Sequence, residues 1–222
     1  MKQYGPHAVV NLVKRLGVTA EIPEVPSICL GTPDISVYEM LGAMSTFANK
    51  GTYIQPSFIT RIEDKNGKVL EEFIPNSDEV FSEEKAYAMI QLMRGVVDGG
   101  TGSRLRFRHH LENQIAGKTG TTQKNADGWF IGLTPELAAG VWVGGEDRSI
   151  HFNSMAEGQG ATMALPIWGK FFTKCYADKK LKLKKEDFAA PKFLDPNLEL
   201  DCSKYDEKYD TGDDTGSEFD NL

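Results

Sequence analysis

The most informative stretch of this sequence is AGKTGTT at residues 116–122, followed by DGWFIGLTP at 127–135 and GVWVG at 140–144. Glycine and β-branched residues here favour extended chain over helix. The pattern predicts strands over residues 114–120, 128–133 and 137–144. The tripeptide at 134–136 is short enough to join the last two strands as a hairpin, which makes them antiparallel.

Periodic apolar residues predict helices around this sheet, over residues 5–15, 36–49, 82–97 and 160–176. Ser36 and Glu39 form a capping box at the start of the second helix. The dipeptide Asn66-Gly67 predicts a hairpin turn between strands at 53–62 and 68–73. Residues 1–176 are expected to form one folded unit, and residues 177–222, first lysine-rich and then acidic, a disordered tail.

Charge and cysteine content exclude several classes of protein. The formal net charge is -7. The stretch 195–222 carries ten Asp or Glu and two Lys, so the rest of the chain has a net charge of +1. A nucleic-acid partner is therefore not expected. The three cysteines have no short spacing, which argues against a disulfide framework or a CxxC metal site. The adjacent histidines His109 and His110 are interpreted as a polar loop, and no metal or cofactor is predicted.

The triplet Gly117-Lys118-Thr119 matches the end of a phosphate-binding loop, but its surroundings do not. Glu112 stands where the first glycine of that loop should be. That loop also opens a helix, whereas Gly120 and the two following threonines favour a strand. Nucleotide binding is therefore rejected.

An alternative role for Lys-Thr-Gly is to line an acyl-transfer site from an edge strand. A substrate carboxylate needs a cation, which Lys118 offers, and hydroxyl donors, which Thr119 and Thr121 offer from one face of the strand. Gly120 leaves room for a substrate backbone. The N–H of Thr121 could donate to a developing oxyanion.

Several segments, taken in order, resemble the C-terminal part of the transpeptidase domain of class A penicillin-binding proteins. They are Leu30–Thr32, Glu39–Gly51, Gly95–Gly102, Gly117–Thr122, Asp127–Pro135 and Gly140–Gly144. The resemblance implies an α+β fold, an antiparallel sheet with helices on both faces, shared with serine β-lactamases. It also implies that the chain is truncated at its N-terminus.

The resemblance implies a reaction as well. In this family a serine attacks the D-Ala-D-Ala end of a peptidoglycan stem peptide and passes the acyl group to an amine, and β-lactams trap that serine. The resemblance assigns Lys118 and Thr121 to catalysis, and Thr119, Gly120 and Thr121 to substrate binding. It places the parent protein at the outer, periplasmic side of the bacterial inner membrane. No signal peptide or membrane segment is visible in this chain.

The family's other two motifs are not matched. Ser-x-Asn is absent, and Ser-x-x-Lys occurs near a helix only at Ser82–Lys85. Ser82 is interpreted as a helix cap, because two carboxylates follow it directly and suit the positive end of a helix. The nucleophile is then expected on a missing N-terminal part of the same protein, and self-association of the isolated chain is expected through surface that this part would cover.

Three other interpretations stay open at this point. The chain could be a complete D,D-carboxypeptidase or β-lactamase, although that needs its own Ser-x-x-Lys. It could be a non-catalytic peptidoglycan- or protein-binding module on the same fold. It could also be one polypeptide of a split enzyme. Trp129 and Trp142 are expected to be core and strand-packing residues rather than ligand contacts.

Overall fold

A three-stranded antiparallel sheet lies at the centre of the computed structural model, which describes residues 4–196, 198 and 200. Its strands are ordered β5 (Ala116–Thr121), β6 (Asp127–Leu133) and β7 (Ala138–Gly144). The register places Lys118 opposite Ile131, and Ile131 opposite Gly140. The predicted strands and the hairpin between the last two are confirmed.

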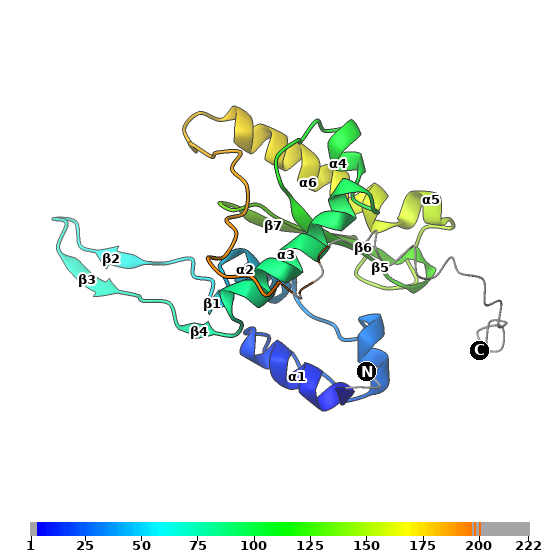
Figure 1. Cartoon of the computed structure of the whole chain (residues 1–222), viewed down its shortest axis with the longest axis horizontal. Helices are drawn as coiled ribbons and strands as arrows, with labels where there is room; N and C mark the ends of the chain where they lie inside the picture. The colour runs from blue at the N-terminus through cyan, green and yellow to red at the C-terminus, as the bar shows by residue number, and fades with distance from the viewer. Residues whose placement is uncertain (1–3, 197, 199, 201–222) are drawn as a thin grey trace.

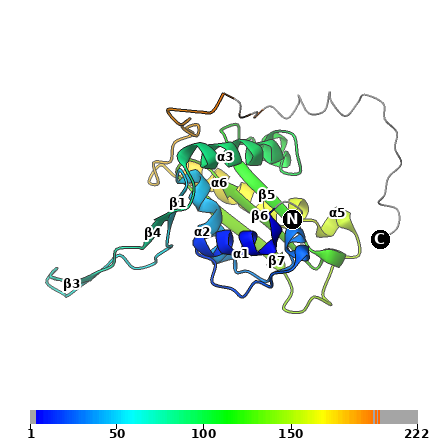
Figure 2. The same cartoon turned by 60° about the horizontal axis from the view of Figure 1, so that its bottom comes forward.

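Helices cover both faces of this sheet (Figures 1 and 2). On one face lie α6 (Gly160–Ala177) and the short α4 (Arg104–Phe107). On the other lie α2 (Val37–Ala48) and α3 (Glu83–Asp98). The predicted α+β arrangement is therefore confirmed. The other helical elements of the described residues are α1 (Gly5–Arg15), α5 (Met155–Gly158) and two 3-10 turns, η1 (Pro26–Leu30) and η2 (Gln123–Asn125).

Trp168 of α6 is the centre of the core on the α6 face. Its side chain is fully buried, stacks on Phe172 at 3.7 Å between ring centroids, and meets Phe130 edge-on at 5.3 Å. The indole N–H donates to the carbonyl of Ala139 at 3.0 Å, so its polar atom is satisfied. A Cβ at position 132 would lie 2.5 Å from this indole. Gly132 is thus what allows α6 to approach the sheet.

The predicted tryptophan roles need correction. Trp129 and Trp142 do pair across β6 and β7, as strand-packing residues should. Neither belongs to the buried core, however, since Trp129 is half-buried and Trp142 is 41 % exposed. Pairing across strands constrains only which residues are opposite, not whether a helix covers them. The core indole is that of Trp168.

The capping box at the start of α2 is confirmed and also anchors the chain after α1. Glu39 N–H donates to Ser36 Oγ at 3.2 Å, and Ser36 N–H donates back to the carboxylate at 3.3 Å. The same carboxylate accepts from the N–H and hydroxyl of Thr19 at 2.9 and 2.8 Å. The Ser36 hydroxyl and then the Thr19 donors lower the pKa of Glu39 from 4.5 to about 2.

This anchor gives the protein a predictable acid sensitivity. A carboxyl whose pKa is lower in the folded state stabilises the fold fully above its unfolded pKa, and that contribution is lost as pH falls. Between pH 4.5 and about pH 2, the ordinary and the folded-state pKa of Glu39, the native chain should lose a contribution to its stability that the Glu39→Gln variant lacks. Urea unfolding of both proteins across this pH range checks the prediction. A stability difference that stays constant with pH would contradict it.

The segment between α2 and α3 differs in part from its prediction. The Asn66-Gly67 turn is confirmed, joining β2 (Arg61–Glu63) to β3 (Val69–Glu72). The predicted strand over 53–62 is instead interrupted. Its start, β1 (Thr52–Ile54), pairs with β4 (Ser77–Glu79), and the chain between β1 and β2 contains Pro56, which has no N–H to donate.

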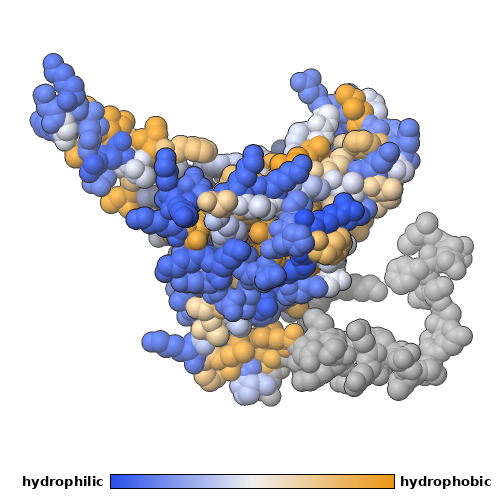
Figure 3. Space-filling view, turned by 90° about the horizontal axis from the view of Figure 1, so that it is seen from above, coloured by the Kyte–Doolittle hydropathy of each residue, from blue (hydrophilic) through white to orange (hydrophobic). Residues whose placement is uncertain are grey.

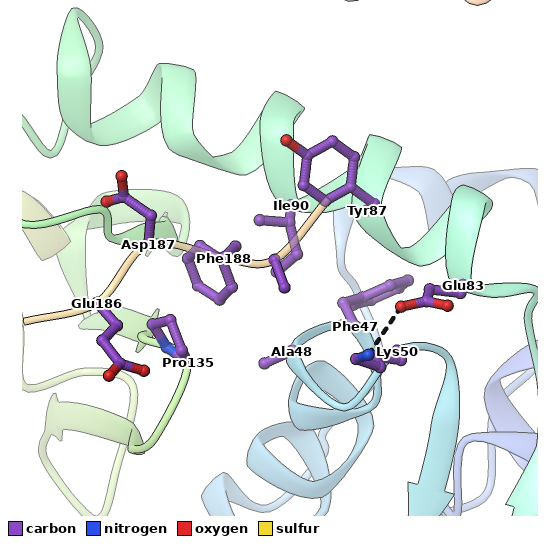
Figure 4. Close-up of a pocket in the computed structure, with 11 residues that line it drawn as sticks. Phe47, Ala48, Lys50, Glu83, Tyr87, Ile90, Pro135, Glu186, Asp187 and Phe188 are labelled. Carbon is purple, nitrogen blue, oxygen red and sulfur yellow. Dashed lines mark ion pairs between the residues drawn. The ribbon is translucent and has the colours of Figure 1, made fainter. Parts of the chain in front are cut away.

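The residues just after α6, the lysine-rich start of the predicted tail, pack against the body of the molecule. The chain crosses beneath α3 and buries Phe188 beside Ile90 (Figure 4). Lys184 N–H donates to Glu136 at 2.6 Å, and Phe188 N–H donates to the Gln114 side chain at 3.1 Å. Burial of the Phe188 ring stabilises the packing of this segment, although the residues around it are mostly polar. Residues 197, 199 and 201–222, the most acidic part, lie outside the described residues.

Candidate active site

The second half of β5 brings the sequence-predicted site residues to the surface. Ala116 and Gly117 at its start are buried, Thr119 and Gly120 are half-buried, and Lys118 and Thr121 are exposed. The Lys118 ammonium donates to the carbonyl of Thr119 at 2.9 Å. Among the described residues, no carboxylate oxygen lies within 4 Å of it. Its charge is therefore open to an anionic ligand.

The two threonine hydroxyls are held by neighbouring elements. The hydroxyl of Thr119 lies 2.7 Å from that of Thr101, in the loop after α3. The hydroxyl of Thr121 accepts the N–H of Gly160, the first residue of α6, at 3.0 Å. Accepting this bond leaves the Thr121 proton free to donate elsewhere.

Two glycines let the N-terminus of α6 approach the end of β5. A Cβ at Gly160 would lie 2.3 Å from the carbonyl oxygen of Gly120, and one at Gly128 would lie 2.9 Å from the Cα of Gly160. Both distances are shorter than a Cβ tolerates. The close approach also places the positive end of the α6 dipole beside Thr121, which favours negative charge there.

The backbone of β5 presents donors at its outer edge. Thr122 N–H donates to the carbonyl of Asp127 at 3.2 Å, so this pair is hydrogen-bonded within the β5–β6 hairpin. Antiparallel ladders alternate, and the N–H groups of Thr121 and Thr119 therefore point away from β6. In the described part of the chain, β5 pairs with no strand on that side.

The cation and the hydroxyls lie on opposite faces of β5, as alternation predicts. Thr119 faces Thr101 in the loop before α4, and Thr121 faces the first residue of α6. Lys118 is on the face of Ile131, the face covered by α2 and α3. A single ligand can meet all three side chains only by lying along the free edge of β5.

Two motifs, Gly117–Thr119 and Ser82–Lys85, have the local structure that the sequence predicts. Gly117-Lys118-Thr119 lies within a strand, so it is not a phosphate-binding loop. Ser82 is the N-cap of α3, where its hydroxyl accepts the N–H of Lys85 at 3.4 Å. Glu83 beside it forms an ion pair with Lys50 at 2.9 Å (Figure 4). The Ser82 hydroxyl thus caps α3, next to the carboxylate of Glu83.

Sequence reasoning missed two residues near this edge. Thr101 touches Thr119, although 18 positions separate them. Arg104 of α4 donates to the carbonyl of Ala161 at 3.0 Å and to the hydroxyl of Thr162 at 2.9 Å, which fixes the first turn of α6. The sequence signal that could have pointed to Thr101 is the Gly-Thr-Gly triplet at residues 100–102, because it indicates a tight turn after a helix.

Two cavities of the described structure lie away from these residues. One, of about 190 Å³, lies between α2, α3 and the segment around Phe188. Another, of about 220 Å³, lies between α2 and β1. Neither is lined by Lys118, Thr119 or Thr121.

Comparison with known families identifies the family to which this fold belongs. The model of the penicillin-binding protein transpeptidase domain matches residues 27–147. This range includes α2, α3 and the whole sheet with its Lys-Thr-Gly strand. The chain belongs to the penicillin-binding protein transpeptidase family.

Curated relatives make the relationship more specific. The chain is 34 % identical over 190 residues to penicillin-binding protein 1A of Aquifex aeolicus, covering 84 % of this chain and 25 % of that protein. It is 37 % identical over 172 residues to penicillin-binding protein 2D of Bacillus subtilis, covering 75 % of this chain and 24 % of that protein. The chain thus spans about a quarter of the length of these relatives.

Solved structures share the fold. Penicillin-binding protein 1A from Haemophilus influenzae superposes with a TM-score of 0.72 at 22 % identity, covering 85 % of this chain and 33 % of that one. PonA1 from Mycobacterium tuberculosis, solved in complex with penicillin V, has a TM-score of 0.67 at 24 % identity, covering 85 % and 54 %. Within the described residues of this chain, none of the helices combines the length and apolar character needed to cross a bilayer.

Proposed function

We propose that this chain supplies the Lys-Thr-Gly wall of the active site of a peptidoglycan D,D-transpeptidase. Family membership and the open, cationic edge of β5 together carry the proposal. In this reaction a serine attacks the carbonyl of the D-Ala-D-Ala bond, and the terminal D-Ala leaves. The acyl group then passes from the serine to an amine of a neighbouring stem peptide.

Lys118, Thr119 and Thr121 are proposed to bind the terminal carboxylate of the stem peptide. The Lys118 ammonium has no carboxylate neighbour among the described residues, and the Thr121 proton is free to donate. Gly120 between them adds no side chain to the edge. β-Lactams carry a carboxylate in the corresponding place and would bind the same groups.

The Thr121 N–H is proposed as one donor of the oxyanion hole. It points outward from the free edge of β5, beside the N-terminus of α6. A donor fixed in a strand needs no reorganisation when charge develops on the carbonyl oxygen. Lys118 is proposed to assist proton transfer as well, because an ammonium near the nucleophile favours the ionised form.

The nucleophile is proposed to lie on a separate part of the enzyme. The one Ser-x-x-Lys near a helix in this sequence is Ser82–Lys85, and Ser82 caps α3 next to a carboxylate. The parent enzyme is proposed to act on the outer side of the inner membrane, where peptidoglycan lies. Residues 1–176 are proposed to form the C-terminal portion of its transpeptidase domain.

Intact-protein mass spectrometry with benzylpenicillin tests this proposal. The chain alone should acquire no covalent adduct. Combined with the nucleophile-bearing segment encoded in the same genome, it should support an adduct on that segment and none on itself. A stoichiometric adduct on this chain would show that it carries its own nucleophile. No adduct in the combined sample, with both polypeptides folded and associated, would also contradict the proposal.

A further inference from the structure

A β-hairpin arm, made of β2, β3 and their turn (residues 61–72), projects away from the body of the molecule (Figure 1). Every residue of both strands is exposed, and among the described residues β2 pairs with β3 alone. An unpaired strand edge is a template for another strand. A two-stranded ribbon is also marginally stable in water, so a further strand would stabilise it.

Apolar side chains make this arm unusual for a surface ribbon. Ile62 is 41 % exposed, Val69 44 % and Leu70 61 %. At the base of the arm, Phe58 and Ile74 are each 88 % exposed. Figure 3 shows hydrophobic residues along this arm between the body and its hydrophilic end. The arm therefore carries apolar area that another surface could cover.

The backbone groups at the free edge of β2 belong to Arg61 and Glu63. Thr60 and Asp64 each make a 2.9 Å backbone hydrogen bond to the β3 side of the hairpin. Alternation along an antiparallel ladder then turns the N–H and C=O groups of Arg61 and Glu63 outward. Their side chains lie on one face of the strand, where they form an ion pair with each other.

We propose that the chain forms a two-fold dimer in which β2 pairs antiparallel with β2 of a second copy, centred on Ile62. This register places Arg61 directly opposite Glu63 of the second copy, at both ends of the pairing. The outward backbone groups then meet as hydrogen-bonded pairs. The two Ile62 side chains meet in the closer, non-hydrogen-bonded position.

Charge complementarity favours pairing through β2, with β2 of a second copy of the chain as the partner. The sequence Arg-Ile-Glu is self-complementary when read against itself in the antiparallel direction. The outer edge of β3 lacks this property, because Val69–Glu72 carries two glutamates and no cation. Self-pairing is also isologous, as a closed two-fold dimer requires. The short pairing makes the dimer weak, so it is measured at high protein concentration.

Sedimentation equilibrium of the purified chain and of two single variants tests the proposal. Arg61→Glu and Glu63→Arg each turn both opposite-charge pairs of the dimer into like-charge pairs. Each variant alone should dimerise at least about tenfold more weakly than the native chain. Lys68→Glu, with the same charge change as Arg61→Glu on the same arm but outside β2, should dimerise within about twofold of the native chain.

Mixing the two single variants distinguishes the charge pairs between two chains from the ion pair within one hairpin. Neither variant has the intrachain ion pair, but their heterodimer has both interchain pairs restored, so the mixture should recover native-like association. A native chain that stays monomeric would overturn the proposal. So would single variants that dimerise as tightly as the native chain, or a mixture that associates no better than its components.

Discussion

Replacing Lys118 by alanine should lower the rate of acylation by a fluorescent penicillin by about 10- to 100-fold, measured on the chain combined with its nucleophile-bearing segment. A charge-assisted hydrogen bond contributes about 1.5–3 kcal/mol, and every 1.4 kcal/mol is about tenfold. The exposed ammonium of Lys118 is positioned for such a bond at the open edge of β5. The expected loss lies in the acylation rate rather than in folding.

Lys174→Ala is the matched control for this experiment. Lys174 lies in the last turn of α6 and is also exposed, and its loss changes the net charge by the same amount. The control should acylate at the native rate. Equal losses in both variants would mean that general charge, not position on β5, attracts the ligand. A native rate in Lys118→Ala would remove Lys118 from the site.

Replacing Trp168 by alanine should cost about 3–5 kcal/mol in the free energy of unfolding, the range for a buried aromatic side chain. Its indole is fully buried, stacks on Phe172 and bonds the Ala139 carbonyl. The variant loses the contact that fixes α6 to the sheet. Because α6 positions Gly160 against Thr121, the same change should also loosen the candidate site.

Trp142→Ala tests whether the burial of Trp168, rather than the loss of a tryptophan as such, sets the cost in the free energy of unfolding. Trp142 is 41 % exposed and lies opposite Trp129 on the neighbouring strand. Its loss should cost about 1 kcal/mol or less, the scale of a cross-strand pair. Urea unfolding monitored by far-UV circular dichroism measures both variants. Equal costs would show that the core is not centred on Trp168.

Local chemistry explains which elements could be predicted from the sequence. Ser36 and Ser82 mark helix starts because their hydroxyls accept backbone N–H groups three residues later. The Asn66-Gly67 turn and the strands of the sheet follow from turn chemistry and β-branched residues in the same way. In each case the signal and the structure it causes lie within a few positions of each other.

Contacts between distant segments explain what could not be predicted. The pairing of β1 with β4 joins Thr52–Ile54 to the polar triplet Ser77–Glu79, which has no strand pattern of its own. Burial of Phe188 depends on space left between α2 and α3. In the candidate site, the strand and its alternation were predictable, whereas the contact of Thr119 with Thr101 depends on how α3 ends against β5.

We propose above all that the free edge of β5 binds the acidic end of the substrate. A crystal structure of the penicillin-acylated complex, with this chain and its nucleophile-bearing segment, tests it most directly. The penicillin carboxylate should lie within hydrogen-bond distance of the Thr119 or Thr121 hydroxyl and face Lys118, and the acyl oxygen should accept the Thr121 N–H. A penicilloyl group bound away from β5, or attached to Ser82, would contradict it.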